Sequence, residues 1–466
     1  FRLITFTQAR DHLKCLRLIS KRFNDLVTPS LFSFFRSWGP YLSSLQQCKD
    51  ITFHASARKS TVFKHTRHLA VDMGIPWDST PIEEIKAWFD MWTILPSAMP
   101  NLSRLTWSLS VEDHPLYLAN DFVQVLGSHT ELNDIILDAR GGSTPPTGLT
   151  LGPLHNLHAF SLMWDLPVPL WPMLIAEVTS LLGRCPKLDS LSLGTRYGYW
   201  QAKTKPHLSN PYGEFVEQWS SLEEPMGLRS LVIRGLRVRS QDFLTHIRHF
   251  KNLESLTIEY DLDAMSHEEL GRIFAIFQED NIHLKRISIC SIHPHQIIDY
   301  LLSYTGLEHF VIDSLDSRDD SPSVVHGFLA VLKLHSSSLR FLAFDVNRIS
   351  PWKDVLWSLF SESAEAFCML EYLQNRVHIS LEDVEANNTE PFCTWLDIAM
   401  RLLALRELRC DPVIFKTGTL RGKRIITPDL IDPPDAKRIL SLIERVINDF
   451  IHERNPKFSI DSYTGF

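Results

Sequence analysis

The chain has 466 residues, of which 44% are hydrophobic and 22% are charged, which is the composition of a folded protein with ample material for a core. It carries 47 Lys and Arg against 55 Asp and Glu, a net charge of −8. It therefore lacks the basic excess with which proteins bind nucleic acid, and we expect no nucleic-acid partner.

The first predicted element is a helix near the N-terminus. Leu16, Ile19, Phe23 and Leu26 stand three or four residues apart, the spacing of an amphipathic helix. Pro29 predicts the end of this helix, because proline disfavours the helical conformation in the residue before it.

The sequence of this helix, LRLISKRFNDLVTPSLF from Leu16 to Phe32, resembles the second half of the F-box in fungal F-box proteins that continue into leucine-rich repeats. In that family the F-box docks on the adaptor subunit of an SCF-type ubiquitin ligase, and the repeats capture the protein to be ubiquitinated. The resemblance implies a partial, helical F-box over residues 1–40, with Leu16, Ile19, Phe23 and Leu26 contacting the adaptor. The family's opening Leu-Pro pair and first helix are absent from Phe1 to His12, and we expect them upstream. A helix that only caps the first repeat is the alternative.

A repeated pattern, Leu-x-x-apolar-x-apolar, follows this segment. Residues 65–73 resemble a first repeat strand, with Leu69 and Val71 as apolar anchors. The first leucines of later copies stand 23 to 40 residues apart, and one gap of 66 residues would hold a degenerate copy near Leu370. This spacing is typical of stretched, uneven leucine-rich repeats. The copies are Leu102/Leu105/Trp107, Leu132/Ile135/Leu137, Leu157/Phe160/Leu162, Leu188/Leu191/Leu193, Leu228/Leu231/Ile233, Leu253/Leu256/Ile258, Leu284/Ile287/Ile289, Leu307/Phe310/Ile312, Leu339/Leu342/Phe344 and Leu405/Leu408/Cys410.

Apolar residues at helical spacing lie between several copies, so each repeat is expected to be a strand followed by a helix. A single repeat cannot bury enough apolar surface to fold alone, and neighbouring repeats must stack. We therefore expect an α/β fold, an irregular leucine-rich-repeat solenoid over 50–415, with parallel strands on its concave face and helices outside. A long insertion is expected at 194–222. Residues 416–466, rich at first in glycine and proline, are expected to form a hairpin or loop and a C-terminal capping helix.

Motifs of catalysis or cofactor binding are not found. The nearest, Gly418-x-x-x-Gly422-Lys423, has too few residues between its glycines for a phosphate-binding loop. The seven cysteines are scattered, and His293-Pro294-His295 offers no third ligand, so we expect no metal and no cofactor. No apolar run is long enough to span a membrane, and no signal peptide is found. We expect an intracellular protein, cytoplasmic or nuclear, that is not an enzyme.

Strand alternation predicts the binding surface. The residues between and just after the second and third anchors would face the concave side, because side chains alternate along a strand. Thr257 and Ser288 stand between these anchors, and acidic residues follow the third anchor of several repeats. These acidic residues are Glu259, Asp313, Asp345 and Asp411. Acids on neighbouring strands repel one another, and a basic partner would relieve that repulsion. The resulting expectation is a substrate-recognition subunit of an SCF-type ubiquitin ligase, with a basic protein substrate on the repeats. The alternative is a leucine-rich-repeat scaffold that binds a partner without any ligase.

Overall fold

The computed structural model describes residues 21–38, 45–57, 61–72, 81–110, 117–140, 150–164, 172–195, 212–259, 267–292, 295–315, 321–346, 359–380, 390–420, 423–427 and 433–461. They belong to two compact units, Phe1–Leu253 and Glu254–Phe466.

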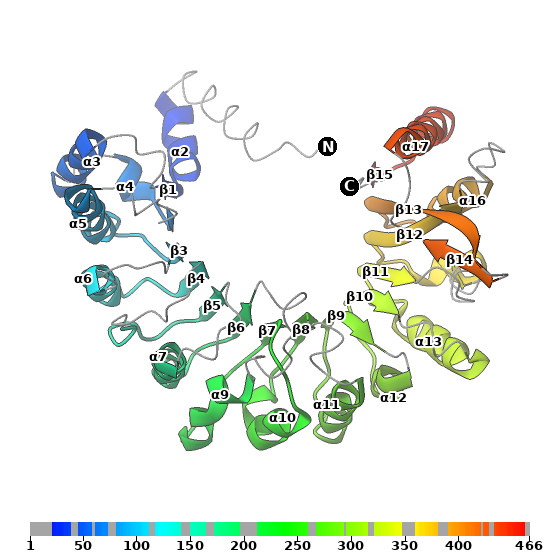
Figure 1. The fold of residues 1–466 in the computed structure, drawn as a ribbon, viewed down its shortest axis with the longest axis horizontal. Coiled ribbons are helices and arrows are strands. Elements are labelled where there is room, and N and C mark those ends of the chain that lie inside the picture. Colours follow the sequence, from blue (N-terminus) through cyan, green and yellow to red (C-terminus); the bar gives the residue numbers. More distant parts are fainter. Residues whose placement is uncertain are drawn as a thin grey trace. The chain divides into compact units, whose positions relative to one another are not determined.

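The first unit holds a parallel sheet whose strands lie side by side in chain order. Its strands are β1 (Phe34–Trp38), β2 (His68–Asp72), β3 (Arg104–Ser110), β4 (Asp134–Arg140), β5 (Ala159–Trp164), β6 (Ser190–Thr195) and β7 (Ser230–Arg234). Its helices are α2 (Lys21–Leu31), α3 (Leu45–Ser56), α4 (Thr61–His65), α5 (Ile82–Ala98), α6 (Tyr117–Gly127), α7 (Pro172–Gly183), α9 (Tyr212–Val216), η4 (Glu217–Ser221), α10 (Ser240–His246) and η5 (Ile247–Phe250). Within this unit, α5, α6, α7 and α10 all lie on one side of the strands (Figure 1).

The second unit repeats this design. Strands β8 to β13 are parallel and follow chain order, β14 pairs antiparallel with the end of β13, and β15 pairs parallel with its start. The strands are β8 (Ser255–Glu259), β9 (Arg286–Ile292), β10 (His309–Leu315), β11 (Phe341–Val346), β12 (Tyr372–Ser380), β13 (Glu407–Leu420), β14 (Lys423–Thr427) and β15 (Ser459–Asp461). The helices are α11 (His267–Glu279), α12 (His295–Leu302), α13 (Pro322–His335), η7 (Ala364–Ala366), α16 (Glu390–Ala399) and α17 (Pro433–Arg454). Helices α11, α12 and α13 share one side of this sheet (Figure 1). Both units are thus α/β, as predicted.

The predicted anchors form the core between the strands and the helices. Second anchors pair with second anchors across neighbouring strands, as Leu191 does with Leu231 and Ile287 with Phe310. All four of these side chains are buried. The degenerate copy near Leu370 is confirmed, because buried Leu370 leads into β12, which lies between β11 and β13.

Two N-terminal predictions are wrong in detail. Within the described residues, the first strand is β1, which precedes the predicted first strand, so residues 1–40 contribute a strand to the sheet and not helix alone. Helix α2 also continues past Pro29 to Leu31. A proline removes only one backbone donor, and the Phe32 N–H still reaches the Thr28 carbonyl at 3.0 Å, which completes the last turn.

Backbone hydrogen bonds link successive repeats at the start of most strands. One carbonyl oxygen accepts two consecutive N–H groups of the next repeat. The Lys285 carbonyl, for example, accepts from Glu308 at 2.8 Å and from His309 at 3.0 Å. The carbonyls that do the same are those of Ser33, Arg67, Ser103, Asn133, His158, Asp189, Glu254, Glu308, Arg340 and Glu371. This recurring contact sets the register between repeats.

Candidate functional site

The open face of the second unit, defined as the side of its sheet away from α11, α12 and α13, carries two rows of side chains. Side chains alternate between the faces of a strand, so the residues on either side of each buried second anchor share the open face. The first row is Ser255, Arg286, His309, Phe341, Tyr372 and Glu407, and the second is Thr257, Ser288, Val311, Ala343, Gln374 and Arg409.

Three rings of the first row form a stack, here called the ring ladder: His309, Phe341 and Tyr372. The His309 and Phe341 ring centroids are 4.1 Å apart with planes inclined by 10°, and those of Phe341 and Tyr372 are 3.9 Å apart with an inclination of 5°. Parallel strands in register, at a spacing of about 4.8 Å, bring equivalent side chains face to face in this way. The Tyr372 hydroxyl donates a hydrogen bond to Gln374 Oε1 at 2.9 Å, which fixes the last ring.

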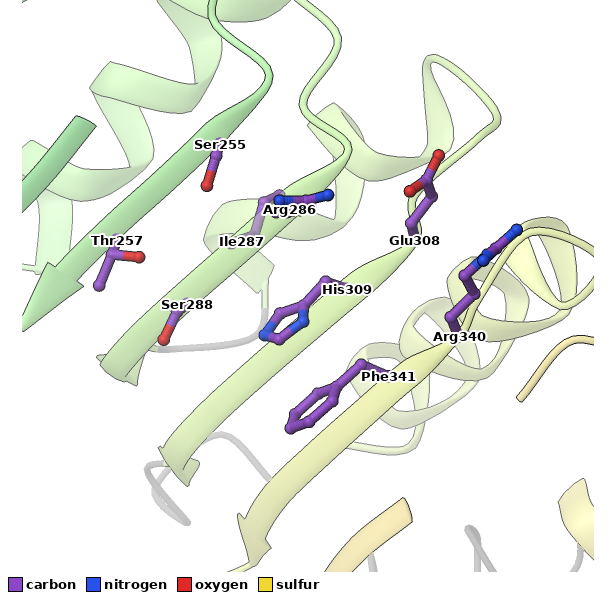
Figure 2. A pocket seen from close by; sticks show the side chains of 9 residues that line it. All are labelled: Ser255, Thr257, Arg286, Ile287, Ser288, Glu308, His309, Arg340 and Phe341. Atoms are coloured by element: carbon purple, nitrogen blue, oxygen red, sulfur yellow. The ribbon is translucent and has the colours of Figure 1, made fainter. Parts of the chain in front are cut away.

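A hollow of about 360 Å³ lies beside the ring ladder (Figure 2). Three small polar side chains on β8 and β9 leave this space open: Ser255, Thr257 and Ser288. The rings of His309 and Phe341 also line it, as do three charged side chains where the strands begin: Arg286, Glu308 and Arg340. Figure 2 shows the two rings side by side on adjacent strands, with the hydroxyls of Thr257 and Ser288 on the strands beyond. The volume of this hollow is at the lower end of the range for ligand pockets.

The charged side chains at the strand starts alternate in sign, and most of them pair. Lys285 contacts Glu254 at 3.2 Å, while Arg340 and Arg406 contact Glu371 at 3.6 Å and 3.3 Å. These are exposed pairs of small individual value.

Arg286 is different, because its side chain makes no ion pair or hydrogen bond among the residues that the structure describes. Burial of the His309 ring and the positive charge of Arg286 lower the pKa of His309. The ring ladder is therefore uncharged at neutral pH and is bordered by an exposed guanidinium.

The four predicted acidic residues each lie four residues after the first-row residue of the same strand. Glu259 ends β8 and is half-buried. Asp313, Asp345 and Asp411 lie on β10, β11 and β13, but their side chains lie outside the described part of the chain. Between β10 and β11 the register shifts: Ile312 pairs with Phe344, and the next pair is Leu315 with Val346. The regular pairing assumed for Asp313 and Asp345 is therefore interrupted by an irregularity, while Asp411 lies opposite Arg376. A site for a basic partner stays a prediction.

The predicted adaptor-binding residues are only partly covered by the structure. Leu16 and Ile19 lie outside the described residues. Phe23 and Leu26 are on α2, which lies beside α4 in the first unit, but their side chains are not described. Adaptor binding stays a prediction.

The open face of the first unit carries charged side chains that contact one another. Arg104 pairs with Asp134 at 3.2 Å, and Arg36 lies 4.0 Å from Asp72. His68 Nε2 lies 2.9 Å from Thr106 Oγ1, and burial together with Arg104 lowers the pKa of His68 to about 4. These charged and polar groups already pair with one another. The second unit, in which Arg286 makes no such contact with a described residue, therefore offers the better candidate site.

Sequence reasoning predicted part of the open face and missed the rest. Thr257 and Ser288, which line the hollow, were both predicted to face the concave side. The first row, with the ring ladder and Arg286, was missed because the alternation was followed only from the second anchor onward. The residue just before each second anchor faces the same side of the sheet as the residue just after it. That step would have found His309, Phe341 and Tyr372.

Other kinds of site lack support in the described residues. No three His, Cys, Asp or Glu side chains gather there as metal ligands. In that same part of the chain, no helix has both the length and the apolar character needed to cross a bilayer. The chain matches no protein-family model, and no curated protein matches its sequence.

Proposed function

We propose that this chain is a leucine-rich-repeat-like recognition protein that binds a partner protein on the open face of its second unit. The observation that carries this proposal is the ring ladder with Arg286 beside it, whose side chain has no ion-pair partner within the part of the chain that the structure describes. Aromatic and arginine side chains are the residues most often responsible for affinity in protein interfaces. The hydrophobic core of the sheet does not need them, because it lies on the opposite face.

Following the resemblance of Leu16–Phe32 to the F-box, the proposal extends to an SCF-type ubiquitin ligase: α2 and the residues before it bind the adaptor, and the repeats deliver the partner. The acids Glu259, Asp313, Asp345 and Asp411 would contact basic groups of that partner.

The competing proposal is a scaffold that binds the partner without a ligase. It is supported by β1, which directly follows α2 and pairs with β2, so that α2 also serves as the beginning of the repeat array.

Co-expression with the SCF adaptor distinguishes these two proposals. The chain, and a version extended by any residues that its gene encodes before Phe1, should co-purify with the adaptor. Ile19→Asp or Phe23→Asp should abolish this, whereas Arg22→Glu at an exposed position of α2 should not. Absence of adaptor binding by both versions would leave the scaffold.

Affinity purification tests the partner-binding surface itself. Phe341→Asp places a charge in the ring ladder, and Gln278→Asp places the same charge at an exposed position of α11 on the helical side. Proteins recovered with the wild type should be lost with the first variant and kept with the second. Equal recovery with both variants would contradict the proposed surface.

A further inference from the structure

The ring ladder ends at β10, beside the hollow. His309 stacks on Phe341, and the residues at the same level on the next two strands are Arg286 and Ser255, neither of which carries a ring. The small side chains of Thr257 and Ser288 leave the hollow open there. A planar group of a ligand could therefore continue the stack against His309 at the spacing that the ladder already has.

The charge of the hollow selects the kind of planar group. Among the side chains that line it, Arg286 and Arg340 are positive and Glu308 is negative, which gives 2 − 1 = +1. Arg340 already contacts Glu371, whereas neither Arg286 nor Glu308 makes an ion pair through its side chain among the described residues. A carboxylate or phosphate would pair with this guanidinium through two parallel hydrogen bonds. A basic group at the same position would be repelled by Arg286.

The hydroxyls of Ser255, Thr257 and Ser288 add hydrogen-bonding groups along the floor of the hollow. An extended peptide has backbone donors and acceptors that such hydroxyls can bind. The hollow thus combines a stacking surface, a guanidinium that makes no ion pair with any described residue, and several small polar groups.

We infer that this hollow binds a segment of the partner protein in which an aromatic side chain stands next to an acidic group, with the aromatic ring stacked on His309 and the acidic group paired with Arg286. The inference rests on the proposed function, since it names the segment recognised by the same open face. It concerns the residues at the strand starts, while the predicted acidic residues lie farther along the strands.

Labelled peptides test the inference by fluorescence anisotropy with the full chain. The probes are Gly-Glu-Trp-Glu-Gly and three matched peptides: one with Lys for both Glu, one with Gln for both Glu, and one with Ala for Trp. The Glu-Trp-Glu peptide should bind at least about tenfold more tightly than the Lys and Ala peptides, the effect of losing one charge-assisted or one stacking contact. A peptide with phosphotyrosine in place of Glu-Trp-Glu determines whether phosphate is preferred over carboxylate.

Variants assign the contacts. Arg286→Gln should weaken binding of the Glu peptide about tenfold and leave the Gln peptide unchanged. Phe341→Ala, which removes the support of His309, should weaken both. Arg272→Gln, at an exposed position of α11, should change neither.

Equal binding of the acidic and basic peptides, or equal effects of Arg286→Gln and Arg272→Gln, would overturn the inference. So would failure of every peptide to bind. The proposed function would still stand in these cases if Phe341→Asp continued to abolish recovery of a partner protein, so the two failures can be told apart.

Discussion

Side chains of different types satisfy equivalent buried backbone groups in several repeats of this protein. Three first-anchor leucines have their backbone N–H bound by a side chain of the following helix or loop. Leu157 donates to Cys185 Sγ at 3.4 Å, Leu284 to the Tyr300 hydroxyl at 3.0 Å, and Leu307 to His335 Nδ1 at 3.2 Å. A cysteine, a tyrosine and a histidine thus satisfy equivalent buried donors. Because the residue type changes from repeat to repeat, no single repeated residue marks this contact in the sequence.

His335 provides the sharpest test at this scale. Its Nδ1 accepts from Leu307, and its Nε2–H donates to the Leu301 carbonyl at 3.0 Å. His335→Leu leaves both backbone groups buried and unsatisfied, so the free energy of unfolding should fall by about 1 to 3 kcal/mol for each group. Urea unfolding measures this. Lys333→Ala, at an exposed position of the same helix, should change it by less than about 0.5 kcal/mol. Equal losses in the two variants would refute the role of His335.

Histidines also make folding sensitive to acid. Burial is the main cause that lowers the pKa of His68, His129, His246, His249, His309 and His335, and for His68 the value falls from 6.5 to about 4. A histidine whose pKa is lower in the folded state than in the unfolded state binds a proton more readily when the chain is unfolded. The contribution of these histidines to the free energy of unfolding should therefore be fully present above about pH 6.5 and be lost as the pH falls toward about 4.

Urea unfolding at about pH 7.5 and about pH 5 checks this expectation. The wild type should be less stable at the lower pH. His68→Gln, which keeps a side chain able to bond Thr106, should reduce the difference. If the variant shows the same difference as the wild type, His68 does not contribute to it.

At the scale of elements, close packing between repeats limits what a position tolerates. A Cβ atom on Gly127, at the end of α6, would lie 2.6 Å from the Cβ and the carbonyl oxygen of Pro153. Because backbone must move to make room, Gly127→Ala should destabilise the first unit by about 1 to 3 kcal/mol. Gly227 is the matched control, since a Cβ there meets nothing within 4 Å. Thermal unfolding of the two variants measures the effect, and similar midpoints would show that the contact with Pro153 is not constraining.

Elements with a complete anchor pattern could be predicted from the sequence, and those without it could not. The strands β3 to β11 and β13 each contain anchors of a recognised copy, and spacing alone located β12. β1 was missed because its sequence, Phe-Phe-Arg-Ser-Trp, lacks the leading leucine. The segment read as an insertion contains α9 and η4, where Tyr212, Phe215 and Trp219 are buried. Aromatic residues there replace the leucines of an ordinary repeat helix, and a leucine pattern cannot detect them.

At the scale of the whole molecule, repetition explains why the site is built as it is. Each repeat places one side chain at the same level of the sheet as its neighbours, so a row of residues scattered over more than a hundred positions becomes one continuous surface. The buried face must keep apolar anchors, whereas the open face is free to carry rings and charges. Substitutions on the open face can therefore change which partner is bound without changing the core.

Photo-cross-linking tests the central claim, that the open face of the second unit binds a partner protein. Benzoylphenylalanine would replace Val311 on the open face in one version of the chain and Gln278 on α11 in another. Irradiation in cells that make the protein should yield a defined cross-linked partner from position 311 only. The additional change Phe341→Asp should abolish that product. Cross-linking of the same partner from position 278, or persistence of the product in the Phe341→Asp variant, would contradict the claim.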